Sequence, residues 1–180
     1  MKDFTRQHTE FSLCGLNCLL CPMQVGGYCP GCGGGPGNQS CAIARCSLDK
    51  GRYAFCNDCS SYPCARYDEF DAADSFVPHS RRAADLDRAR EVGLDAYIGE
   101  LRAKRAILDN LLAGYNDGRR KTFYCAAVYL LPLEDLQSVV AKLENLPECS
   151  AKERATAAVK LLQGAADGHG VCLKLKKKKG

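Results

Sequence analysis

The sequence predicts a small, mainly helical α+β protein, in which a cysteine-rich N-terminal lobe packs on a C-terminal bundle of about five helices. Two observations predict this class. Ten of the thirteen cysteines fall within residues 14–64, which are rich in glycine and poor in large aliphatic side chains. From residue 81 onward, apolar residues recur at helical spacing instead. The predicted organisation is a cysteine-rich lobe over residues 12–78, a helical lobe over 79–176 and a disordered basic tail over 177–180.

The expected compartment decides how the cysteines are interpreted. The N-terminal sequence lacks the apolar run of a signal peptide, and no run of 18 apolar residues could span a membrane, so we expect a cytoplasmic protein. Disulfides do not persist in a reducing cytosol, and an odd number of cysteines cannot be fully paired within one chain. Metal–thiolate bonds are therefore the expected stabilising interaction of the cysteine-rich lobe, with one or two zinc sites.

The candidate metal ligands are the ten clustered cysteines, and no catalytic residue or other cofactor-binding residue is predicted. Two C-x2-C pairs, Cys29/Cys32 and Cys56/Cys59, can each direct both thiolates at one ion. A helix beginning just after Cys59 would give a treble-clef site. The full set of candidate ligands is Cys14, Cys18, Cys21, Cys29, Cys32, Cys41, Cys46, Cys56, Cys59 and Cys64.

The triplet Cys14-x3-Cys18-x2-Cys21 suggests a different cofactor. Its spacing matches the cluster loop of radical-SAM enzymes, but the repeated strand–helix units of those enzymes are absent from the sequence. A [4Fe–4S] cluster without radical chemistry, with a fourth ligand such as Cys64, is the alternative to zinc.

The sequence leaves the partition of the ligands open, since ten thiolates exceed two tetrahedral sites by two. In one version Cys29, Cys32, Cys41 and Cys46 form one site, and the N-terminal triplet joins members of the 56–64 group. In the other version the two C-x2-C pairs form one site against the rest.

Ser80 is the predicted N-cap of the first helix of the helical lobe. Gly93, Gly114 and Gly164 end three of the predicted helices, and Pro132 lies in the first turn of the fourth. Ser150 and Glu153 form a capping box that opens the last helix. Cys125 lies in an apolar helix and is interpreted as a buried structural thiol. The predicted helices span 80–92, 94–113, 120–131, 132–143 or 132–146, and 150–164; the alternation over 171–176 predicts a short strand.

Charge argues against a nucleic-acid partner. The net charge is +4, and subtracting the five lysines of residues 174–179 leaves −1 for the body of the chain. A body near neutrality offers no broad electrostatic footprint for phosphate backbones. We therefore expect neither a nucleic acid nor a membrane as partner, and leave an unknown protein partner open.

The cysteine pattern resembles a known family. Cys14-Gly15-Leu16-Asn17-Cys18-x2-Cys21-Pro22, then Gly31-Cys32, Cys41-x4-Cys46 and Cys56-x2-Cys59-x2-Tyr62-Pro63-Cys64, together with the stretches LDRAREVGLDAYIGE and YNDGRRKTFYCAAVYLLPLEDL, resemble a cysteine-rich prokaryotic domain-of-unknown-function family (group 3795). The resemblance covers most of residues 12–140. It implies a small soluble protein that binds zinc or an iron–sulfur cluster through these cysteines, and it implies no activity.

The residues thus favour a zinc-stabilised binding or adaptor module. The alternative is an iron–sulfur protein for electron transfer or cluster handling. An enzyme would need a reactive thiol or a metal with an open position, and all-cysteine sites are usually closed. Whether the protein is an enzyme is left undecided.

Overall fold

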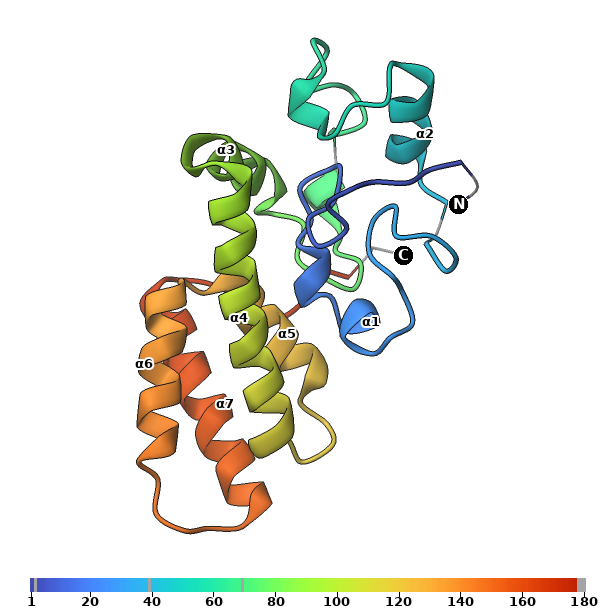
Figure 1. Ribbon diagram of the computed structural model, residues 1–180. Coiled ribbons are helices and arrows are strands. Elements are labelled where there is room, and N and C mark those ends of the chain that lie inside the picture. The colour runs from blue at the N-terminus through green and yellow to red at the C-terminus, as the bar shows by residue number, and fades with distance from the viewer. Residues whose placement is uncertain (2, 39, 69, 178–180) are drawn as a thin grey trace.

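Every regular element that the structure describes is a helix (Figure 1). The computed structural model describes residues 1, 3–38, 40–68 and 70–177. The predicted mainly helical character is confirmed, whereas the α+β class is not supported, because these residues contain no strand. No described helix is long and apolar enough to cross a membrane.

All five helices predicted for the helical lobe are present. The capping box is confirmed as well, since Ser150 Oγ accepts from Glu153 N and the Glu153 carboxylate accepts from Ser150 N. The last helix continues past Gly164, where the prediction ended it, because Ala166 in its next turn is fully buried in the core. The helices are α3 (Arg82–Val92), α4 (Leu94–Gly114), α5 (Lys121–Leu130), α6 (Leu133–Glu144) and α7 (Ala151–Gly168).

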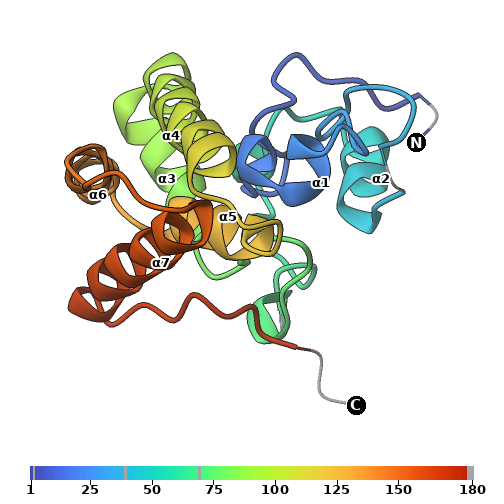
Figure 2. The same ribbon diagram turned by 90° about the horizontal axis from the view of Figure 1, so that it is seen from below.

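One hydrophobic core joins the helices to the cysteine-rich lobe. α4 and α5 lie between the α6–α7 pair and the N-terminal loops, as Figure 2 shows from below. Leu108 of α4 and Val128 of α5 are fully buried in this core, and so are Phe11 and Leu20 from the N-terminal segment. Phe11 contacts Tyr97 of α4 with ring centroids 4.9 Å apart. The lobe is therefore held on the bundle by ordinary apolar packing.

The cysteine-rich lobe consists of loops and short helices. A helix that the sequence analysis missed, α2, begins directly after Cys41 and contains Cys46. The treble-clef expectation is wrong, since a 3₁₀ turn covers Cys56–Asp58 and the first α-helix after Cys59 begins only at Arg82. The elements are η1 (Cys18–Leu20), α1 (Pro22–Val25), α2 (Ala42–Asp49), η2 (Cys56–Asp58) and η3 (Phe70–Ala72).

The segment over 171–176 is not a strand. Lys176 N donates to Asp74 Oδ2 (2.7 Å) and Asp74 N donates to Lys176 O (2.9 Å). A strand requires a continued ladder of such bonds with a second strand. The segment pairs with the loop around Asp74 at one position only, so no ladder forms. Lys177 is exposed, and residues 178–180 of the predicted disordered tail lie outside the described residues.

Candidate metal centre

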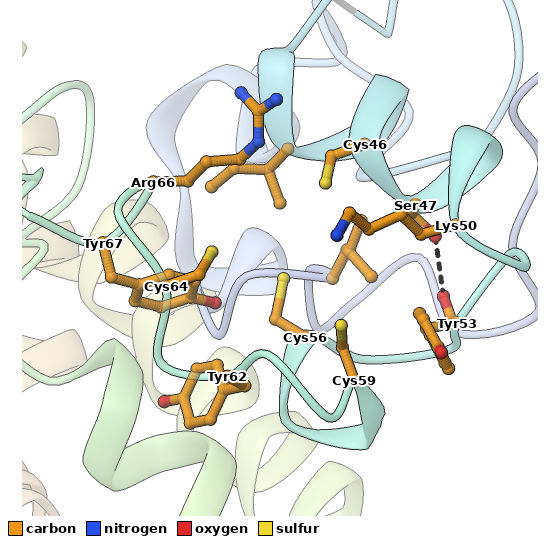
Figure 3. A pocket seen from close by; sticks show the side chains of 12 residues that line it. Cys46, Ser47, Lys50, Tyr53, Cys56, Cys59, Tyr62, Cys64, Arg66 and Tyr67 are labelled. Carbon is orange, nitrogen blue, oxygen red and sulfur yellow. Dashed lines mark hydrogen bonds between the residues drawn. The ribbon is translucent and has the colours of Figure 1, made fainter.

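Four cysteines from the second half of the lobe line one cavity. They are Cys46 in α2, Cys56 and Cys59 at η2, and Cys64 after the Tyr62–Pro63 peptide. Figure 3 shows their four sulfur atoms directed into the same space. The cavity has a volume of about 40 Å³ and is partly open to solvent. All thirteen cysteines of the chain lie within the described residues and are free thiols.

Local hydrogen bonds hold these four segments against one another. Cys56 N donates to Leu13 O (2.9 Å), and this bond holds η2 against the N-terminal segment. Ser47 Oγ donates to Tyr53 O (3.1 Å), which ties α2 to the segment leading into η2. Ile43 and Ala44 bury the inner face of α2, so that Cys46 in the next turn faces the cavity.

The cavity wall combines apolar groups with cationic side chains. Leu13 and Ile43 line it together with the ring of Tyr67, and the side chains of Lys50 and Arg66 also reach it (Figure 3). Burial raises the pKa of the Cys56 thiol to about 12, and the nearby hydroxyl of Tyr67, which donates to Cys14 O (3.2 Å), opposes that rise. Four thiolates around a dication carry a net charge of −2, so nearby cations suit such a centre.

A buried cation contacts the cavity lining at Tyr67. The guanidinium of Arg82 lies between the rings of Tyr67 and Phe70, 4.0 and 3.9 Å from their centroids. Arg82 is 2% exposed, and its Nε donates to Asp71 Oδ1 at 2.8 Å. Cation–π contact with desolvated rings stabilises a charge that burial would otherwise disfavour. Arg82 thereby fixes the Tyr67 ring whose hydroxyl faces Cys56.

The other six clustered cysteines form a connected series, which meets the four-thiol cavity where Cys14 lies near Cys56. Cys18 interacts electrostatically with Cys14, Cys21 and Cys32, and Cys21 interacts with Cys29. Cys14 interacts in turn with Cys32 and Cys41. Burial is the first cause that raises the pKa of Cys14, to about 11, and of Cys18, well above its ordinary value. Cys14 and Cys18 therefore lie in a poorly hydrated region, whereas Cys41 at the end of the series is exposed.

Hydrogen-bond donors face the sulfurs of this series. The backbone N–H of Cys32, which donates to Thr9 O (3.3 Å), also lies near Cys18 and lowers the pKa of its thiol against the effect of burial, and the N–H groups of Met23 and Gln24 do the same for Cys21. The guanidinium of Arg6 lies beside Cys32, where it lowers the thiol pKa against the effect of burial. Such donors stabilise thiolates, and hydrogen bonds of this kind accompany both zinc and iron–sulfur ligation.

The structure groups the ligands differently from both predicted partitions. Cys46 joins Cys56, Cys59 and Cys64 at the cavity, whereas each predicted partition placed Cys46 apart from the Cys56/Cys59 pair or divided that pair from Cys64. Within the described residues, no three cysteine, histidine, aspartate or glutamate side chains are already arranged as a finished metal site. The four thiols share one cavity with the donor chemistry of a metal centre, but their coordination geometry is not formed.

Cys125 and Cys172 lie outside the cluster of ten cysteines. Cys125 is 2% exposed in α5, as a buried structural thiol, and Cys172 is exposed near the C-terminus. Sequence reasoning missed Arg6, Tyr67 and Arg82, which surround the thiols. Their contacts join residues that are distant in sequence, and no spacing rule within the chain signals them.

No protein-family model, no curated protein sequence and no solved structure matches this chain. The resemblance to the cysteine-rich family therefore stays a prediction.

Proposed function

We propose that this protein is a metal-binding module, in which zinc held by Cys46, Cys56, Cys59 and Cys64 stabilises the cysteine-rich lobe. One observation carries the proposal: four free thiols from separate segments face a single cavity that has no disulfide to close it. Four thiolates are a common ligand set of structural zinc.

The energetics of the lobe support a metal. Its own buried cluster contains only five residues: Phe4, Leu13, Cys14, Ile43 and Ala44. Burial disfavours ionisation of Cys56, whereas a bound dication supplies the charge that makes thiolates stable there. Binding of the metal and ordering of the surrounding loops would then be one coupled event.

The six-cysteine series is the proposed place of a second site. N–H and guanidinium groups near Cys18, Cys21 and Cys32 favour their thiolate forms, which suits a zinc ion and equally an iron–sulfur cluster, whose sulfurs are tuned by nearby donors. That observation keeps an iron–sulfur protein as the second candidate function.

A closed four-thiolate site has no open position for a substrate, so the proposed role is to present a surface to a protein partner. Tyr28 lies between Cys21 and Cys29 and is 72% exposed, the most exposed large hydrophobic side chain among the described residues. Exposed aromatic side chains are frequent anchors of protein–protein contacts.

The test is metal and acid-labile sulfide analysis of the full chain, purified without oxygen, beside the variants C64S and C172S. We expect zinc without sulfide at the proposed cavity, with one zinc fewer in C64S and an unchanged content in C172S, because Cys172 lies outside the cluster. A protein in which C64S retains all of its zinc, or which holds only iron and sulfide, contradicts the proposal.

A further inference from the structure

A second cleft lies away from the cysteines, between α3, α4 and the connection from α5 to α6. It has a volume of about 450 Å³, is partly open to solvent, and is lined by residues of α3, α4, α5 and α6. That size is in the range of small-molecule sites. We call it the interhelical cleft, and its polar floor is formed by Asn17, Asp85, Tyr97, Lys104 and Tyr129.

Two opposite charges are buried at this floor. Asp85 is 4% exposed and Lys104 is 8% exposed. The ion pairs among the described residues do not join them to each other: Asp85 pairs with Arg81, and Lys104 has no carboxylate within 4.0 Å. Buried charges are unfavourable unless they are paired and hydrogen-bonded.

Each of the two groups keeps unused hydrogen-bonding capacity. Asp85 Oδ2 accepts from Asn17 Nδ2 (3.0 Å), but Oδ1 lies 3.6 Å from Arg81 Nε, too long for a hydrogen bond. Lys104 Nζ donates to Leu131 O (2.8 Å), and an ammonium group has three N–H donors. The cleft therefore offers an anionic acceptor and a cationic donor to whatever enters it.

The rest of the lining limits the class of ligand. Arg88 and Glu100 are paired with each other by two hydrogen bonds to Glu100 Oε2, at 2.8 and 3.2 Å, so each already has a partner of opposite charge. Three cations and three anions line the cleft, so a ligand without net charge fits best. One wall is apolar and consists of Leu101, Leu130, Leu131, Pro132 and Leu133.

We propose that the interhelical cleft binds a small zwitterion of the apolar α-amino-acid class. The ammonium group of the ligand would pair with Asp85, and its carboxylate with Lys104. Its side chain would pack on the apolar wall. This arrangement pairs both buried charges at once, which neither a simple carboxylate nor a simple amine can do. The proposal concerns no cysteine and is independent of the metal.

The test is isothermal titration calorimetry of the full chain at pH 7.5 with leucine. Alanine, valine, methionine and phenylalanine are titrated as well, to vary the size of the ligand's side chain. Two analogues separate the charges: 4-methylpentanoate lacks the ammonium group and 3-methylbutylamine lacks the carboxylate. We expect saturable binding of at least one amino acid, and binding at least tenfold weaker for the matching analogues. If no amino acid binds, or if either analogue binds as tightly, the proposal is overturned.

Three variants locate the site. Lys104→Met keeps the aliphatic stem without the charge, and Asp85→Asn keeps an acceptor for Asn17 without the charge. K104M and D85N are each expected to weaken amino-acid binding at least tenfold. Lys160→Met, on the exposed face of α7, is the matched control and should bind as the wild type does. Circular dichroism verifies the fold of each variant, and unchanged affinity in folded K104M and D85N would also overturn the proposal.

Discussion

Asn17, the residue directly before Cys18, donates a hydrogen bond from Nδ2 to Oδ2 of Asp85 over 3.0 Å, across 68 positions of sequence. The hydroxyl of Tyr97 donates to Asn17 Oδ1 (3.1 Å), and Asn17 N donates to the hydroxyl of Tyr129 (3.2 Å). Asn17 is 3% exposed. Its side chain and backbone thus anchor the loop of Cys18 to α3, α4 and α5 at once.

Removal of this anchor should be costly. Asn17→Ala leaves buried hydrogen-bonding groups of Asp85 and Tyr97 without a partner, and we expect the free energy of unfolding to fall by about 2–4 kcal/mol. Guanidinium denaturation of the two proteins measures it. Asn145→Ala is the control, because Asn145 is exposed and bonds only Ala141 O within its own helix. Equal effects of the two substitutions would show that Asn17 anchors nothing.

Asp85 should make stability depend on pH in an unusual direction. Burial raises its pKa from the ordinary 3.8 to about 6, although Arg81 and Lys104 oppose the rise. The folded protein then binds a proton more tightly than the unfolded chain does. The stability that Asp85 contributes is therefore full below about pH 3.8 and is lost as pH rises through about 6.

The variant D85N isolates this effect, because asparagine does not titrate in this range. The stability of the wild type relative to D85N should decline between about pH 4 and pH 7, by about 3 kcal/mol at most. Denaturation at a series of pH values measures the difference. The groups that face Asp85 from its neighbours are Asn17, Arg81, Tyr97, Lys104 and Tyr129. A difference that is constant with pH, or that grows in favour of the wild type, would contradict the raised pKa.

Metal removal should affect the two lobes unequally. The cysteine-rich lobe has few buried apolar residues of its own, whereas α4 to α7 share the main core. On treatment with a strong chelator, we expect amide protection to be lost over residues 14–64 and retained in α4, α5 and α7. Hydrogen exchange followed by mass spectrometry resolves the segments. Protection of residues 14–64 that survives complete loss of metal would refute metal stabilisation of this lobe.

The helices were predictable because their signals are local. Gly93 adopts φ +88° at the predicted boundary between two helices, and the Ser150–Glu153 box spans only four residues of sequence. The error at Gly164 has a tertiary cause, since the burial of Ala166 outweighs the helix-breaking tendency of a glycine. The short strand over 171–176 failed for the same kind of reason, because pairing depends on a partner that the local pattern does not specify.

The residues of the candidate metal centre could be predicted from the sequence, but the way in which the structure groups them could not. The ten cysteines and their segment are evident from the sequence, but Cys46 and Cys64 share a cavity only because Cys56 bonds Leu13 and α2 packs through Ile43. The sequence left the partition of the ligands open, and neither version placed Cys46 with the Cys56/Cys59 pair. The interhelical cleft was missed altogether, because Asn17, Asp85 and Lys104 are far apart in sequence and have no common motif.

X-ray absorption at the zinc edge tests the central claim most directly. The double substitution C18S/C32S is used to disable the second site, so that the protein carries one zinc per chain. For this protein the account predicts four sulfur ligands at about 2.3 Å from the zinc. The further substitution C59S should remove one sulfur or the metal itself, since Cys59 lines the proposed cavity. A zinc shell that contains nitrogen or oxygen ligands, or four sulfurs that persist in C59S, would contradict the assignment of Cys46, Cys56, Cys59 and Cys64 as the metal centre.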